Sequence, residues 1–223
     1  MEFKLKIEEN YIQVDCPEQR YNLTIRRKDQ KTPWRQIMFK QEVGISKESV
    51  YITGRTLEEY DEDVRNIPFD QNAQYMEIGA GLGGFIPSLI DRLGDSLNKK
   101  PIVVDQANYE LMLQMLKRGQ EVISAENYSQ NALDNLRSFI ERAEFYNSSD
   151  KIDLINLPFG MALRTFPDLI GKVDYLVDHR GSRLYPQIEN SMDSVENYWN
   201  NAINMRNLRK AIMSPSGSFA GDF

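Results

Sequence analysis

Two acidic residues and a run of glycines carry the clearest chemistry in the sequence. Residues 76–85 read Met-Glu-Ile-Gly-Ala-Gly-Leu-Gly-Gly-Phe, so Glu77 comes just before a loop that contains Gly79, Ala80, Gly81 and Gly83. A strand that runs into glycines and then into a helix lets the backbone approach a ligand closely, and the helix N-terminus offers N–H donors to an anion. Such a loop is typical of a site for a carboxylate or a phosphate.

Asp105 follows about 20 residues after this loop, at the end of the next apolar run. A carboxylate in that place can accept hydrogen bonds from both hydroxyls of a ribose. The loop and Asp105 together predict a site for a ligand that contains a nucleoside.

Hydrophobic periodicity predicts the elements that hold these residues. From residue 74 onward, short apolar runs alternate with helical patterns, which is typical of βα units around a mainly parallel sheet. The expected strands cover residues 75–78, 101–104, 152–157, 173–177 and 218–223. A long segment separates Asp105 from the third of these strands, and its spacing predicts one helix near residues 109–116 and an added helix over about residues 131–145.

The first 70 residues have a different pattern. Apolar residues alternate with polar ones over residues 3–7, 11–14 and 21–25, which predicts a small antiparallel unit. We expect residues 28–70 to form loops with one or two short helices. The sequence therefore predicts two parts: an N-terminal β-rich or mixed extension over residues 1–70, and an α/β core over residues 71–223.

Composition narrows the classes of function. The chain has 223 residues, a net charge of −6, one cysteine and one histidine. A single cysteine forms no intramolecular disulfide, and one histidine makes no zinc-ligand cluster, so we expect a reduced, cytoplasmic setting and no metal site. The charge argues against a protein that coats nucleic acid. We also expect no membrane span and no secretory signal, because no apolar run is long enough.

The glycine loop fits two ligand classes. Gly79, Gly81 and Gly84 satisfy the G-x-G-x-x-G pattern of dinucleotide enzymes. Residues 77–83 also resemble the first motif of class I S-adenosylmethionine-dependent methyltransferases, in which an acidic residue and any residue precede Gly-x-Gly-x-Gly. Glu77 favours the methyltransferase pattern, because nicotinamide enzymes usually have an apolar residue there. Residues 103–105, 172–178 and 214–219 resemble the second motif, the fourth strand and the turn before the fifth strand of that family.

This resemblance covers roughly residues 70–223 and implies a three-layer, doubly wound, Rossmann-like core that binds S-adenosylmethionine. It implies that Gly79, Gly81 and Gly83 shape the pocket for the methionine part and that Glu77 lies near its amino group. It further implies that Asp105 binds the ribose and that Gln106 lies by the adenine. Asn156 stands where the family often has an acidic residue that reaches the adenine amino group.

The expected activity is methyl transfer to a small molecule or a protein. The Asn/Asp-Pro-Pro-Tyr motif of methyltransferases that modify nucleic-acid amino groups is absent. Candidates for a catalytic base are His179 and Asp178, at the carboxyl end of the fourth predicted strand.

Two alternatives stay open. The chain has no residues for the sixth and seventh strands of the family, so a non-catalytic or truncated binding subunit is one alternative. The second alternative, which is less favoured, is an NAD(P)-dependent oxidoreductase. Formation of a homo-oligomer is also left open.

Overall fold

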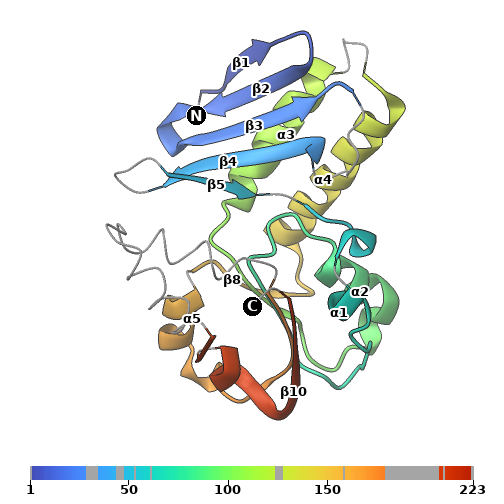
Figure 1. Ribbon diagram of the computed structural model, residues 1–223, viewed down its shortest axis with the longest axis vertical. Helices are drawn as coiled ribbons and strands as arrows, with labels where there is room; N and C mark the ends of the chain where they lie inside the picture. The colour runs from blue at the N-terminus through green and yellow to red at the C-terminus, as the bar shows by residue number, and fades with distance from the viewer. Residues whose placement is uncertain are drawn as a thin grey trace. The chain divides into compact units, whose positions relative to one another are not determined.

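Two five-stranded sheets, one antiparallel and one parallel, organise the chain (Figure 1). The computed structural model describes residues 2–28, 35–43, 48–52, 54–60, 62–123, 128–157, 159–178, 206–207 and 209–221. The fold is therefore mixed α/β, with the antiparallel sheet at the N-terminus, as the sequence predicts. Within these residues, no helix is both long enough and apolar enough to span a bilayer.

The N-terminal sheet is an antiparallel meander. Its strands, in spatial order, are β1 (Lys4–Ile7), β2 (Tyr11–Cys16), β3 (Tyr21–Arg26), β4 (Ile37–Val43) and β5 (Glu48–Ile52). A 3-10 turn, η1 (Pro17–Gln19), joins β2 to β3. Alternate residues of β2 and β3 are buried, which places one face of the sheet against a core and leaves the other face polar.

The expectation of loops over residues 28–70 is wrong for β4 and β5. Ile37 and Phe39 are fully buried, whereas Lys40, which follows Phe39, keeps part of its surface exposed. This is the two-residue period of a strand, but it spans only a few residues and is flanked by Pro33 and charged residues. The expected short helices do occur, as η3 (Leu57–Glu59) and α1 (Glu62–Arg65).

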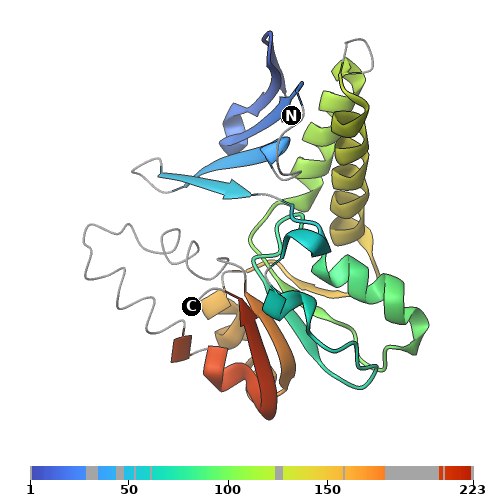
Figure 2. The same cartoon turned by 45° about the vertical axis from the view of Figure 1, so that its right-hand side comes forward.

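A helical hairpin accompanies the antiparallel sheet. Helices α3 (Tyr109–Ile123) and α4 (Gln130–Ser148) lie side by side (Figure 2), and α3 packs on β2 and β3. A side chain at Gly119 of α3 would place its Cβ 2.6 Å from Cδ1 of Ile25, so the helix approaches the sheet closely there. The Ser129 hydroxyl accepts a hydrogen bond from the N–H of Ala132 and caps α4. The added helix predicted from the spacing is confirmed.

The second sheet is parallel throughout. Its spatial order is β10 (Met213–Gly221), β9 (Val173–Asp178), β6 (Tyr75–Ile78), β7 (Ile102–Val104) and β8 (Asp153–Ile155). Taken in chain order, these strands lie 5-4-1-2-3, which agrees with the first five strands of the doubly wound order. The direction in which strands are added reverses between β6 and β9, and open parallel sheets bind ligands beyond the carboxyl ends of their strands at such a point.

Short helical segments connect the parallel strands. They are α2 (Phe85–Leu93), η4 (Gly94–Ser96), α5 (Phe159–Thr165) and η5 (Pro167–Leu169). Buried side chains of β6, β7, β9 and α5 form one apolar cluster, which includes Ile78, Val104, Leu176 and Phe159.

The chain groups into two compact units. The antiparallel sheet and the helical hairpin lie in the first, which comprises Met1–Glu59, Gly81–Gly84 and Asn108–Ser149. The parallel sheet lies in the second, which comprises Tyr60–Ala80, Phe85–Ala107 and Asp150–Phe223. The glycine loop is therefore divided, with Gly79 and Ala80 in the unit of the parallel sheet. The division at residue 70 stays a prediction.

Candidate functional site

The glycine turn begins directly after β6. Gly79 and Gly81 have φ values of 67° and 54°, a left-handed conformation that residues with a Cβ rarely adopt. The N–H of Gly79 donates a 2.8 Å hydrogen bond to the carbonyl of Val104, so the first residue of the turn continues the pairing of β6 with β7. This geometry accounts for the glycines at both positions, and it brings the turn to the carboxyl ends of two neighbouring strands.

Glu77 is a buried carboxylate on β6, with 2% of its surface exposed. The hydroxyl of Tyr60 donates a 2.8 Å hydrogen bond to its Oε1 atom. Both residues belong to the unit of the parallel sheet. Sequence reasoning singled out Glu77 but missed Tyr60, which stands in a charged segment with no periodicity to mark it.

Asp105 is fully buried where β7 ends. Its Oδ1 accepts a 2.7 Å hydrogen bond from the N–H of Ala107, which closes a tight turn around Gln106. The register pairs Glu77 of β6 with Val103 of β7, and Asp105 follows Val103 by two residues, just beyond the end of β7. The structure thus brings both predicted carboxylates to the same end of the sheet.

Asn156 follows β8 and holds the Asp105 turn. Its Nδ2 donates to the carbonyl of Asp105 at 3.1 Å and to the carbonyl of Ala107 at 2.9 Å. With these donors used by the turn, its side-chain oxygen is the group that can face a ligand. Gln106 lies between the two carbonyls and is partly exposed. Asp105, Gln106 and Asn156 therefore form one connected group.

Asp178 ends β9 and pairs in register with Ile78. It is fully buried, and its Oδ2 lies 2.7 Å from Nε of Arg209, which is itself 6% exposed. The guanidinium of Arg209 also stacks over Phe219 of β10, 5.3 Å from the ring centre. The sequence did not point to Arg209. His179, the other predicted base, lies outside the described residues.

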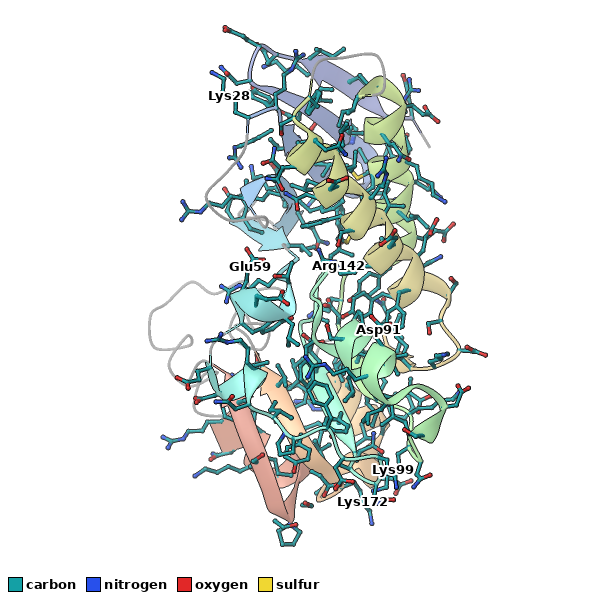
Figure 3. The ribbon with its side chains drawn as sticks, turned by 90° about the vertical axis from the view of Figure 1, so that its right-hand side faces the viewer. Lys28, Glu59, Asp91, Lys99, Arg142 and Lys172 are labelled. Atoms are coloured by element: carbon teal, nitrogen blue, oxygen red, sulfur yellow. The ribbon has the colours of Figure 1, made fainter. Side chains whose placement is uncertain are left out.

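The rest of the predicted loop belongs to the other compact unit. Gly81 and Gly83 are buried there, together with Leu82. Tyr146 and Arg142 of α4, the latter labelled in Figure 3, donate hydrogen bonds to carbonyl oxygens of this segment. Sequence reasoning missed both residues: a charged residue such as Arg142 is most simply expected on the solvent face of a helix, and Tyr146 lies just beyond the predicted helix.

The antiparallel sheet carries a further surface feature. A concave surface of about 500 Å³ opens on the polar face of the antiparallel sheet, and Gln13, Asp15, Arg20 and Lys40 are among its lining residues. It contains none of the predicted site residues. In the part of the chain that the structure describes, no group of three or more His, Cys, Asp or Glu side chains is arranged to hold a metal ion.

Comparisons with protein-family models, curated proteins and solved structures found no match to this chain. The features that bear on function are the strand order of the parallel sheet and the side chains at the strand ends. Of the predicted residues, the structure gathers Glu77, Gly79, Ala80, Asp105, Gln106, Asn156 and Asp178 at the carboxyl ends of four parallel strands. The carboxyl and amide oxygens of such a group can accept hydrogen bonds from hydroxyl or ammonium groups.

Proposed function

We propose that this chain is an S-adenosylmethionine-dependent methyltransferase that binds its cofactor at the carboxyl ends of β6 and β7. The observation that carries the proposal is a pair of buried carboxylates, Glu77 and Asp105, at the ends of neighbouring parallel strands, with the glycine turn between them in sequence. The order of the five strands also supports a three-layer, doubly wound core as part of this proposal.

The donor set fits the parts of S-adenosylmethionine. Asp105 is a carboxylate at the position where Rossmann-like folds bind ribose hydroxyls. Gly79 and Ala80 present backbone without a large side chain, as close approach to the methionine part requires. Glu77 supplies a negative charge for the amino group of that part, and Tyr60 fixes one of its oxygens.

The same carboxylate disfavours a dinucleotide. A nicotinamide cofactor would bring the two negative charges of its pyrophosphate to the glycine turn, two residues from buried Glu77. Repulsion between like charges is strong where water is excluded. Glu77 therefore favours a cationic ligand over an anionic one.

When bound, the cofactor supplies a methyl group that leaves the sulfonium sulfur in an in-line displacement, while the sulfur keeps the bonding electron pair. The protein contributes chiefly by holding the acceptor on that axis. Oδ2 of Asp178 lies 2.7 Å from Nε of Arg209, and this pair fixes the orientation of the carboxylate. We therefore assign it to orienting the end of β9, and we assign any proton removed from the acceptor to His179.

Methyl transfer is tested with tritium-labelled S-adenosylmethionine. The full chain is incubated with a small-molecule extract and, separately, with a protein extract, and heat-denatured chain serves as the control. The proposal predicts label in one of the two extracts above the control. Binding of S-adenosylhomocysteine without any label in either extract would contradict catalysis and favour a non-catalytic binding subunit.

A further inference from the structure

The second half of the glycine loop is held through its carbonyl oxygens. Nη1 of Arg142 donates to the carbonyl of Leu82 at 2.7 Å, and the hydroxyl of Tyr146 donates to the carbonyl of Gly83 at 2.8 Å. Residues four apart in a helix lie on the same face, so a single face of α4 makes both bonds. Figure 3 shows Arg142 on this helix.

Gly54 and Arg55, which follow β5, contact the same part of the glycine loop. Arg142 Nη1 also donates to the carbonyl of Arg55 at 3.0 Å, and that carbonyl accepts a 2.8 Å bond from the N–H of Gly84. A Cβ at Gly54 would lie 2.4 Å from the carbonyl oxygen of Leu82. The two backbones are therefore in direct contact, and Arg142 bridges a carbonyl of each.

Both donors are themselves fixed. Arg142 is 8% exposed, donates from Nε and Nη2 to the carbonyl and hydroxyl of Ser138, and stacks over Phe139, 4.8 Å from the ring centre. Tyr146 is 1% exposed and stacks on Tyr109 with ring centres 5.0 Å apart. Arginine is rarely buried, because removing its charge from water is costly. A residue that only filled space here would more simply be apolar.

We propose that Arg142 and Tyr146 are positioning residues that hold the glycine loop in its ligand-binding conformation. Gly81 is joined to Ala80 by a peptide bond, so fixing Leu82 and Gly83 restricts the conformations open to Gly79 and Ala80. A carbonyl that accepts from a guanidinium also polarises its own peptide unit, which makes the N–H of Gly83 a stronger donor. The identity of the ligand rests on the proposed function, but the restraint on the loop does not.

The test measures two quantities in the full chain. Hydrogen exchange followed by mass spectrometry reports the opening of peptides over residues 79–86, and calorimetry reports the affinity for S-adenosylhomocysteine. In Arg142→Met and Tyr146→Phe, we expect exchange of residues 79–86 to be at least about 10-fold faster than in the unaltered chain, with exchange over β2 and β3 unchanged. We expect the affinity to fall by about 10-fold, because the loop must then be ordered on binding.

Arg137→Met is the matched control. Arg137 lies on α4 with 65% of its side chain exposed, so its loss should change neither quantity. Tyr146→Phe removes one hydroxyl and keeps the stacked ring, so it provides the test where Arg142→Met does not fold.

Three outcomes decide between the explanations. Exchange of residues 79–86 at the unaltered rate in a folded variant would overturn the proposed restraint. Faster exchange over every element, together with a lower melting temperature, would show a structural role only and would also overturn it. Failure of the unaltered chain to bind S-adenosylhomocysteine would contradict the proposed function, whereas the exchange result would still decide the restraint.

Discussion

The hydroxyl of Tyr60 lies 2.8 Å from Oε1 of Glu77, and both side chains are buried in the unit of the parallel sheet. A neutral phenol orients the carboxylate without cancelling its charge. Tyr60 therefore holds Oε1 of Glu77 in place on the strand that leads into the glycine turn. The proposed function places the amino group of the cofactor near that turn, where an ionised Glu77 would attract it.

Glu77→Gln should weaken binding of the amino acid part of the ligand and leave binding of the nucleoside part unchanged. Glutamine keeps an oxygen that accepts from Tyr60 but loses the negative charge. We expect affinity for S-adenosylhomocysteine to fall by about 10-fold or more, since a hydrogen bond to a charged group contributes about 1.5–3 kcal/mol. Affinity for methylthioadenosine, which lacks the amino acid part, should stay unchanged.

Calorimetry with both ligands measures this difference. Glu121→Gln is the control, because Glu121 is 64% exposed on α3. Equal losses of affinity for both ligands would show that Glu77 does not face the amino acid part.

Asp105→Asn should lower the affinity of the chain for both S-adenosylhomocysteine and methylthioadenosine. The asparagine oxygen can still accept from the N–H of Ala107 and keep the turn, while the carboxylate that we propose to bind the ribose hydroxyls is lost. We expect affinity for S-adenosylhomocysteine and for methylthioadenosine to fall by about 10- to 100-fold. Asp95→Asn, at a fully exposed carboxylate, serves as the control in the same titrations. Unchanged affinity for methylthioadenosine would remove Asp105 from the nucleoside site.

The Asp178–Arg209 pair predicts a large effect on stability. Arg209→Met leaves the fully buried carboxylate of Asp178 without its cationic partner, and breaking a buried pair in this way costs about 3–5 kcal/mol. The free energy of unfolding in urea measures the loss. Adding Asp178→Asn to Arg209→Met should recover part of it, because the uncompensated charge is then removed. A loss below about 1 kcal/mol for Arg209→Met would contradict the account of this pair.

The contacts of Asp174 make the stability of the fold depend on pH. The backbone N–H of Gln74, followed by the hydroxyl of Ser214 and the ammonium of Lys99, favours its ionised form and lowers the pKa of Asp174 below its ordinary value of 3.8. A lowered pKa in the folded state means that the ionised carboxylate stabilises the fold. This contribution is fully present above pH 3.8 and is lost as the pH falls through the pKa of the folded state.

Asp174→Asn should therefore be less stable than the unaltered chain at neutral pH, and the difference should narrow below pH 3.8. Urea unfolding at a series of pH values from about 7 to about 3 measures it. A difference that stays constant or widens toward low pH would contradict the assignment.

The parallel sheet was largely predictable because most of its strands are short apolar runs with clear ends. The exception is the last strand, predicted over residues 218–223 after a turn, because β10 already begins at Met213 and contains an irregularity between Met213 and Ser218. The predicted strand over residues 75–78 coincides with β6. The predicted strand over residues 152–157 is longer than β8, because Asn156 turns its side chain back to the carbonyls of Asp105 and Ala107. That contact joins residues about 50 apart in the chain, so no local pattern could indicate it.

The candidate site was predictable where a motif is local and not where partners come from distant elements. Gly79 and Gly81 stand in a run of glycines that the sequence shows directly, and the structure adds that both adopt a left-handed backbone conformation. Arg142 and Arg209 are buried by contacts with residues far along the chain, and arginine in a helical pattern predicts exposure instead. Strand β4 was missed because the alternation of buried and exposed residues in it spans only a few residues.

Binding of S-adenosylmethionine at the ends of β6 and β7 is the step on which the proposed function depends. It is measured by titration calorimetry of the full chain with S-adenosylhomocysteine, NAD and NADP under the same conditions. We expect binding of S-adenosylhomocysteine and of neither nicotinamide cofactor. Binding of NAD or NADP, or binding of none of the three, would contradict it.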